Sequence, residues 1–163
     1  MTGFGDAVIE EGKPAPDFKL VADDGRTISL KDFRGKRVVL YFYPKDDTPG
    51  CTVEACAFRD TLPDVSSAGA VVLGVSRDDS ESHRRFKEKF RLNFPLLSDP
   101  DTKVHRAYGA WGKKILYGKE TEGVIRSTVL IDEQGRVVKH WPHVKAEGHA
   151  AQVLEALAAA PKA

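Results

Sequence analysis

The sequence predicts a three-layer α/β sandwich with a central mixed β-sheet and an N-terminal β-hairpin. Two apolar runs, 37–43 (RVVLYFY) and 70–76 (AVVLGVS), are rich in β-branched and aromatic residues. Such runs are typical of strands buried on both faces of a sheet. A helix-forming segment separates them, and two buried strands joined by a helix form a right-handed parallel crossover. Two later strand-forming runs flank a Gln134-Gly135 turn, and their antiparallel pairing makes the sheet mixed.

The sequence of the N-terminal part of the chain predicts a loose segment followed by a β-hairpin. Residues 1–11 contain two glycines that weaken regular structure, so we expect this segment to be loose. The length of the remaining chain predicts a single domain over residues 12–163. Segment 12–17 (GKPAPD) has two prolines and predicts extended backbone. Strands at 18–21 and 27–30 flank an Asp-Gly dipeptide, which is a strong turn signal.

The middle of the chain alternates short helices and strands. One helical turn is expected at 30–33, and a longer helix from about Thr52 to Val65. Segment 80–90 (SESHRRFKEKF) is amphipathic, and its first serine is a suitable N-cap. A short strand at 94–97 and a short helix at 103–108 follow.

The C-terminal part predicts a second hairpin and a closing helix. Strands at 125–132 and 137–141 flank the turn. Segment 147–159 is rich in alanine, and Leu154 and Leu157 mark its apolar face. The complete order of elements is compatible with a thioredoxin-like core, although a fold alone does not give a function.

Composition and charge narrow the class of protein. Of the 163 residues, 41% are hydrophobic and 30% are charged, as in soluble globular proteins. The net charge is +1, so no basic field favours nucleic acid or an anionic membrane as a partner. The N-terminus lacks a secretory pattern, and the longest apolar run, 38–43, is too short to span a bilayer. We therefore expect a cytoplasmic protein.

The chain has only two cysteines, Cys51 and Cys56. A disulfide-stapled secreted scaffold would have more, so the pair suggests redox chemistry, metal binding or no function. The CxxxxC spacing differs from the CxxC of structural zinc sites, and Pro142 separates His140 from His143. We expect no metal, and no binding motif for a flavin or haem cofactor is visible.

Cys51 follows the first central strand, next to the start of the predicted helix. Free N–H groups and the positive end of the helix dipole favour a thiolate there, and the thiolate is the nucleophilic form of cysteine. The alternative is a small buried hydrophobic residue. The Pro-Gly-Cys turn and the second cysteine nearby favour the reactive role.

Two residues of the preceding loop are further candidates. The Thr48 hydroxyl can accept a hydrogen bond from a substrate and donate one to a thiolate, or can simply bond its own backbone. Pro44 lacks an N–H group, so it can shield the thiolate from water, end the strand, or do both.

The pattern P-x-x-x-T-x-x-C, formed by Pro44, Thr48 and Cys51, resembles the active-site motif of peroxiredoxins. With Cys56 five residues further on, it resembles the Q-type or bacterioferritin comigratory protein subgroup. The resemblance is nearly end to end and includes segments 12–18 (GKPAPDF), 117–119 (YGK) and 123–128 (GVIRST).

The resemblance implies that Arg126 meets Cys51 and that Glu54 orients this arginine. A guanidinium keeps its charge, stabilises a thiolate and donates hydrogen bonds to peroxide oxygens. Without the resemblance, Arg126 would be interpreted as a solvated strand residue and Glu54 as a surface helix residue.

The resemblance also implies a catalytic cycle. Cys51 reduces hydrogen peroxide or an organic hydroperoxide and becomes a sulfenic acid, and Cys56 condenses with it to an intramolecular disulfide. A thioredoxin-like protein then reduces the disulfide. We expect no cofactor, and a monomer.

Two other functions remain open. A protein disulfide oxidoreductase would carry CxxC, which is absent, and would not need Thr48 and Arg126. A peroxide-sensing binding module on the same fold would be oxidised only once per molecule. Peroxide consumption with and without a thioredoxin system distinguishes these functions.

Overall fold

The computed structural model describes residues 9–159, so most of the segment predicted to be loose, residues 1–8, lies outside the described range. The strands are β1 (Lys19–Ala22), β2 (Thr27–Ser29), β3 (Arg37–Phe42), β4 (Ala70–Ser76), β5 (Leu96–Ser98), β6 (Trp111–Leu116), β7 (Lys119–Val124), β8 (Ser127–Ile131) and β9 (Val137–Trp141). The helices are η1 (Leu30–Phe33), α1 (Pro49–Ser67), α2 (Ser80–Phe90), α3 (Lys103–Ala107) and α4 (His149–Ala159). No helix within the described range is long and apolar enough to cross a membrane.

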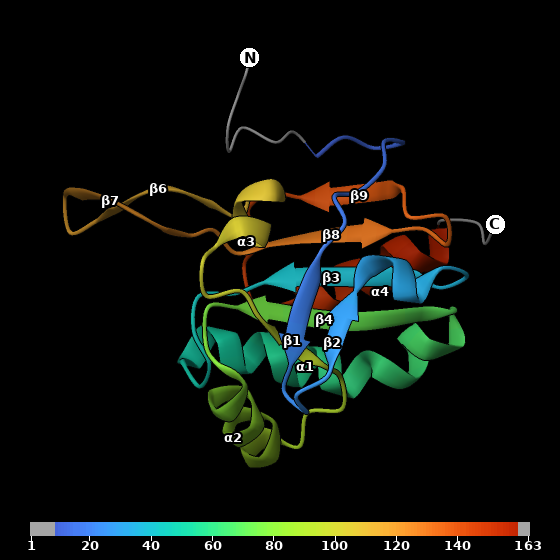
Figure 1. Cartoon of the computed structure of the whole chain (residues 1–163), viewed down its shortest axis with the longest axis horizontal. Coiled ribbons are helices and arrows are strands. Elements are labelled where there is room, and N and C mark those ends of the chain that lie inside the picture. The colour runs from blue at the N-terminus through green and yellow to red at the C-terminus, as the bar shows by residue number, and fades with distance from the viewer. Residues whose placement is uncertain (1–8, 160–163) are drawn as a thin grey trace.

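Seven strands form one mixed sheet in the order β2-β1-β5-β4-β3-β8-β9 (Figure 1). Strand β4 pairs in parallel with β3 and β5, and the other pairs are antiparallel. The parallel β3-α1-β4 unit is the predicted crossover. The N-terminal hairpin joins the same sheet through β1 and β5.

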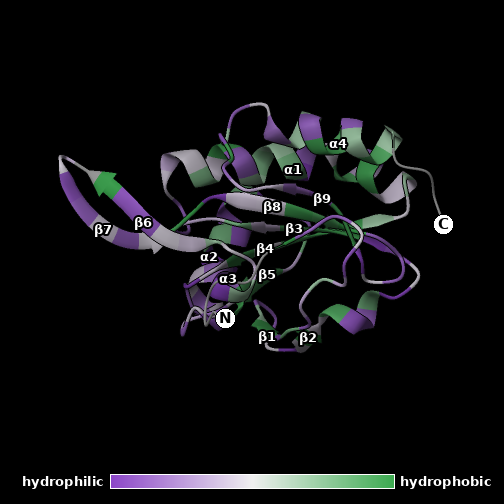
Figure 2. Cartoon of the chain, turned by 90° about the horizontal axis from the view of Figure 1, so that it is seen from above, coloured by the Kyte–Doolittle hydropathy of each residue, from purple (hydrophilic) through white to green (hydrophobic). Residues whose placement is uncertain are grey.

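Strand β3 lies at the centre of the sheet and contributes to a core on each face. Val39 and Tyr41 pack with residues of α1 and α4, whereas Leu40 and Phe42 pack with residues of β1 and β2. Figure 2 shows α1 and α4 on one side of the sheet and the N-terminal hairpin on the other. All six residues of β3 are buried, and five of them, from Val38 to Phe42, form the continuous apolar run that a strand covered on both faces requires.

Three predicted helix starts need correction. Helix α4 begins at His149 rather than at residue 147. Helix α1 begins at Pro49 rather than at Thr52, because a proline in the first turn has no N–H group to leave unpaired. Cys51 therefore lies within the first turn. The N-cap of α2 is Asp79 rather than Ser80: the Asp79 carboxylate accepts a hydrogen bond from the Ser82 backbone N–H at 2.8 Å.

The β6–β7 hairpin was not predicted from the sequence. It projects away from the rest of the fold in Figure 1, and residues of its tip such as Ile115 and Tyr117 are exposed. Because much of the hairpin is exposed and charged, it lacks the buried apolar face that gives a strand its sequence signal. Its turn, Tyr117-Gly118, has positive φ at both residues, as hairpin turns of this type require.

Candidate active site

Cys51 lies in the first turn of α1, beyond the carboxyl end of β3. Its side chain is 1% exposed and belongs to the core between the sheet and helices α1 and α4. The Arg126 guanidinium donates a hydrogen bond from Nη2 to the Cys51 Sγ at 3.2 Å. The helix N-terminus and the guanidinium both favour negative charge on this sulfur.

Arg126 reaches the site from the short segment between β7 and β8. Its Nη1 donates to the Glu54 Oε1 at 2.5 Å, so one guanidinium bridges Glu54 and Cys51. Burial alone would lower the pKa of Arg126, but the charges of Glu54 and Cys51 outweigh it and raise that pKa. The guanidinium is therefore a permanent cation beside the sulfur.

Glu54 lies three residues after Cys51, and residues at this spacing share one face of a helix. The surface location considered for Glu54 is wrong, because its side chain is fully buried. Loss of hydration raises its pKa to about 7, although Arg126 acts in the opposite direction. Its second oxygen, Oε2, has no hydrogen-bond partner among the described residues. This geometry is suited to orienting Arg126.

Glu54→Gln is expected to remove a pH dependence of stability that the carboxyl creates. The pKa of this group is raised from 4.5 to about 7 in the folded protein. Between these values the folded protein keeps a proton that the unfolded chain releases, so the wild type loses stability as the pH rises through this window. The stability of the variant relative to the wild type should therefore increase by about 2–4 kcal/mol between about pH 4 and about pH 8. Urea unfolding of both reduced proteins measures this difference, and a difference that does not change with pH contradicts the prediction.

Thr48 is the N-cap residue of α1, and its hydroxyl donates to the Lys45 carbonyl oxygen at 2.8 Å. The hydroxyl proton is therefore directed at the loop backbone. No hydrogen bond from Thr48 to Cys51 is found in residues 9–159. The lone pairs of the hydroxyl remain available to accept a hydrogen bond from a peroxide.

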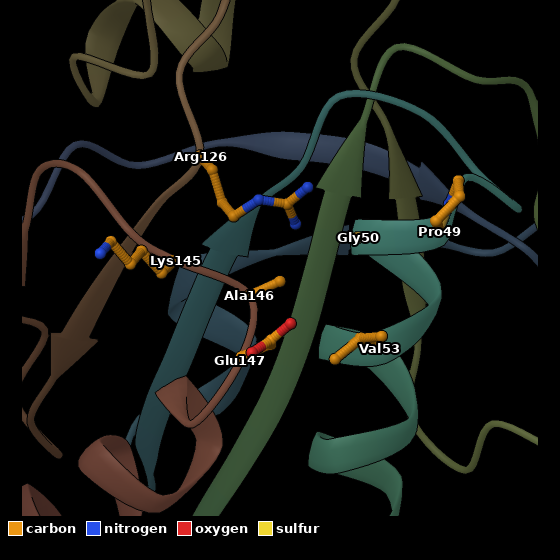
Figure 3. Close-up of a pocket in the computed structure, with 7 residues that line it drawn as sticks. All are labelled: Pro49, Gly50, Val53, Arg126, Lys145, Ala146 and Glu147. Carbon is orange, nitrogen blue, oxygen red and sulfur yellow. The ribbon is translucent and has the colours of Figure 1, made fainter.

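Two hollows flank Arg126. One, of about 360 Å³, is lined by Pro44, Arg126 and Val144 together with residues of β6. The other, of about 550 Å³, lies between the start of α1 and the loop before α4 (Figure 3). Figure 3 shows the Arg126 guanidinium pointing towards Gly50, and the Arg126 side chain, which is 17% exposed, is part of the lining of this hollow.

Sequence reasoning missed two residues around this centre. A side chain at Gly50 would meet the Arg126 Nη2 at 3.3 Å, so the glycine allows the guanidinium to approach the helix closely. Tyr41 is a buried residue of β3, and burial together with the charges of Glu54 and Cys51 raises its pKa. The Pro-Gly-Cys turn was a signal for Gly50, whereas Tyr41 gave none because it lies within an apolar run.

Cys56 lies on the same continuous helix as Cys51, and both are free thiols. Cys56 is half-buried and therefore more accessible than Cys51. The described part of the chain contains no group of three or more His, Cys, Asp or Glu side chains that could hold a metal ion. A buried cysteine beside a fixed cation, with a second free cysteine nearby, defines a thiol-based redox centre.

Comparison with known proteins identifies the kind of redox protein. Residues 11–140 match the AhpC/TSA family. The chain is 52% identical over 146 residues to a putative peroxiredoxin Bcp of Coxiella burnetii, covering 90% of this chain and 97% of that one. It is 50% identical over 149 residues to peroxiredoxin Bcp of Bacillus subtilis, covering 91% and 95%. The structure of Xanthomonas campestris bacterioferritin comigratory protein, described with alkyl peroxide reduction activity, superimposes with a TM-score of 0.86 at 44% identity, covering 94% and 98%.

The chain therefore belongs to the AhpC/TSA family, within its Bcp or Q-type peroxiredoxins. This confirms the predicted family and the thioredoxin-like fold. It also confirms the predicted enzyme class, a thiol-dependent peroxidase.

Proposed function

We propose that the chain reduces hydrogen peroxide and organic hydroperoxides with Cys51 as the attacking nucleophile and Cys56 as the resolving cysteine. One observation above all supports this proposal: the Arg126 guanidinium donates a hydrogen bond to the Cys51 Sγ at 3.2 Å, and its other terminal nitrogen donates one to Glu54. A thiolate beside a fixed cation is a stable nucleophile, and the same cation stabilises charge that develops on a peroxide oxygen.

In the first step the Cys51 thiolate attacks one oxygen of the peroxide. An S–O bond forms and the O–O bond breaks, so the sulfur is oxidised to a sulfenic acid and the peroxide is reduced. The departing oxygen takes a proton from solvent and leaves as water or an alcohol. Arg126 donates hydrogen bonds to the oxygens during this step. The Thr48 hydroxyl accepts a hydrogen bond from the peroxide, and Pro44 limits access of water.

In the second step the Cys56 thiol condenses with the sulfenic acid. An S–S bond forms, and the oxygen leaves as water. A thioredoxin-like dithiol then reduces the disulfide by exchange and becomes a disulfide itself. The pair lies within one chain, so the cycle needs no second copy, and we infer a monomer. A reducing compartment such as the cytoplasm suits two free thiols.

Stopped-flow mixing of the reduced protein with hydrogen peroxide, followed by thiol loss, tests this proposal. We expect a second-order reaction that consumes two thiols, and continuous peroxide consumption once a thioredoxin system is added. A single stoichiometric oxidation without turnover would instead support the peroxide-sensing function, and thiol exchange without peroxide reduction would support a disulfide oxidoreductase.

Formation of the disulfide is expected to unwind part of α1. Five residues of a regular helix place the two cysteine Cα atoms about 8.7 Å apart and about 140° apart around the axis. A disulfide usually needs Cα atoms within about 6.8 Å. Because α1 is continuous from Pro49 to Ser67, the bond cannot form without local unwinding. Phe58 is fully buried and stacks on Tyr41 at 4.8 Å between ring centroids, so it should hold the helix beyond this point.

Hydrogen exchange of the reduced and oxidised proteins measures this change. Oxidation should remove protection over at least one turn between Val53 and Phe58, and reduction should restore it. Peroxide-treated Cys56→Ser is the matched control, since it is oxidised at Cys51 but cannot form the bond, and it should keep its protection. Equal protection from Thr52 to Phe58 in both states of the wild type would refute the unwinding.

A further inference from the structure

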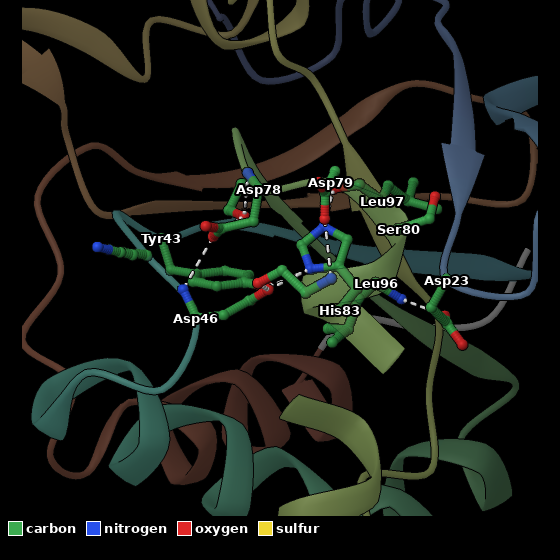
Figure 4. Close-up of polar contacts among 12 residues, drawn as sticks. Asp23, Tyr43, Asp46, Asp78, Asp79, Ser80, His83, Leu96 and Leu97 are labelled. Atoms are coloured by element: carbon green, nitrogen blue, oxygen red, sulfur yellow. Dashed lines mark hydrogen bonds and ion pairs between the residues drawn. The ribbon is translucent and has the colours of Figure 1, made fainter. Parts of the chain in front are cut away.

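A buried cluster of polar side chains underlies the loop between β3 and α1 (Figure 4). At its centre the Asp46 carboxylate accepts hydrogen bonds from the Tyr43 hydroxyl at 2.5 Å and the Ser82 hydroxyl at 2.8 Å, and its Oδ2 lies 2.7 Å from the His83 Nδ1. His83 is fully buried and Asp46 is 7% exposed. These four residues, the Asp46 cluster, take no direct part in the chemistry of Cys51, so their arrangement needs another explanation.

The Asp46 cluster ties the loop to two other elements. The Asp46 backbone N–H donates to the Asp78 carboxylate at 2.9 Å, and the same oxygen accepts from the Ser76 hydroxyl at the end of β4. Ser82 and His83 belong to α2. The loop that carries Pro44 and Thr48 is therefore held from both β4 and α2 at Asp46, whereas the neighbouring Asp47 adds only an exposed ion pair with Lys89 of α2 at 2.8 Å.

Both ring nitrogens of His83 are engaged. The His83 Nε2 lies 3.0 Å from the Leu97 carbonyl oxygen, which can only accept, so Nε2 carries a proton. The Nδ1 lies 2.7 Å from the Asp46 Oδ2. A buried polar pair of this kind is weak evidence for stability as such, which points to a role in conformation.

We propose that Asp46 and His83 are positioning residues of the peroxide site. They hold the loop so that the side chains of Thr48 and Pro44 are positioned next to Cys51, where they can orient the peroxide. The Thr48 hydroxyl is itself tied to the Lys45 carbonyl, next to Asp46, so a displacement of Asp46 displaces the group that accepts a hydrogen bond from the peroxide. This role rests on the proposed function of Cys51, and it acts on the orientation of the peroxide rather than on the thiolate.

Asp46→Ala tests the role because two reactions of Cys51 should respond differently. The rate constant with hydrogen peroxide should fall about 10- to 100-fold, since displacements of about 1 Å have effects of this size. Alkylation by iodoacetamide needs only the thiolate, which Arg126 and the helix N-terminus still stabilise, so it should stay within about twofold of the wild type. A purely structural defect would slow both reactions alike.

Asp46→Asn is the conservative rescue. The asparagine oxygen can accept from Tyr43, and its amide group can donate to Nδ1 of a neutral His83 and to the Ser82 hydroxyl. Nε2 still donates to the Leu97 carbonyl. Every contact of the side chain then persists without charge, so the peroxide rate should stay within about threefold of the wild type.

Asp99→Ala is the matched control, because the chain contains a second buried Asp–His pair. The His105 Nδ1 lies 2.6 Å from the Asp99 Oδ2, and both residues are buried. The hydrogen bonds of Asp99 run to α3 and to the end of β4, and none of those in the described range reaches residues 43–48. This variant should lose stability and keep the wild-type peroxide rate.

The positioning role is overturned if Asp46→Ala reacts with peroxide as fast as the wild type, if it slows equally towards peroxide and iodoacetamide, or if Asp99→Ala slows as much. Should Asp46→Ala fail to fold, Ser82→Ala removes a single donor to Asp46. It should slow the peroxide reaction about two- to tenfold with unchanged alkylation, and an unchanged peroxide rate overturns the role. A wild-type protein that does not react with peroxide would refute the proposed function instead.

Discussion

Cys51→Ser is expected to abolish peroxide reduction, with a loss on the order of 10⁴-fold or more, as for the nucleophile of other covalent catalysts. Serine is a weak nucleophile unless a base removes its proton. Within residues 9–159, the side chain that hydrogen-bonds the Cys51 Sγ is Arg126, whose guanidinium is a donor and cannot act as that base. Stopped-flow mixing with hydrogen peroxide, followed by catalytic turnover with a thioredoxin system, measures the loss.

Cys56→Ser is the matched comparison, because it removes one sulfur from the same helix. The first oxidation should keep its wild-type rate, whereas recycling by a thioredoxin-type reductant should be lost. Small thiols can supply the missing sulfur and restore turnover. If Cys56→Ser stops the first oxidation and Cys51→Ser does not, the two roles are reversed.

Arg126→Lys is expected to slow the peroxide step about 100- to 1000-fold although the charge is kept, which is the usual effect of removing one donor from an oxyanion site. The wild-type guanidinium uses one nitrogen for Glu54 and another for Cys51. A lysine ammonium is a single compact donor group and cannot reproduce this planar fork. The expected loss therefore comes from geometry rather than from charge.

The second-order rate constant with hydrogen peroxide measures this effect. Arg136→Lys is a suitable control, because Arg136 is an exposed arginine that donates to the Gly12 carbonyl near the N-terminal segment. It should react at the wild-type rate. An Arg126→Lys variant that also reacts at the wild-type rate would remove Arg126 from the catalytic site.

The central strands could be predicted from the sequence because burial on both faces requires an uninterrupted run of apolar residues. The five residues of β3 from Val38 to Phe42 each belong to one of the two cores, so this part of the strand contains no polar alternation. The one-turn helix at 30–33 also has the predicted bounds. The β6–β7 hairpin gave no such signal, since exposed strands have no requirement for apolar residues.

Within the site, the reactive cysteine could be predicted because the groups that make it reactive lie close to it in the sequence. The Pro-Gly-Cys turn, the start of α1 and the second cysteine all lie within eight residues, 49–56. Arg126 was placed near Cys51 only through the resemblance to a family, because 75 residues separate the two in the chain. The alternative, a solvated strand arginine, is excluded by its contact with the Cys51 sulfur.

By itself the sequence determined the layers of the fold, the family and the candidate nucleophile. These depend on hydrophobic periodicity and on local motifs, which can be recognised in residues that are close together in the chain. Only the tertiary structure decided which distant groups surround Cys51 and how they are held. The bridge from Glu54 through Arg126 to Cys51, the direction of the Thr48 proton and the contact of His83 with Asp46 all depend on how the elements pack. Burial then sets the chemistry, because the same carboxyl that would be an ordinary acid on the surface has its pKa raised to about 7 at Glu54.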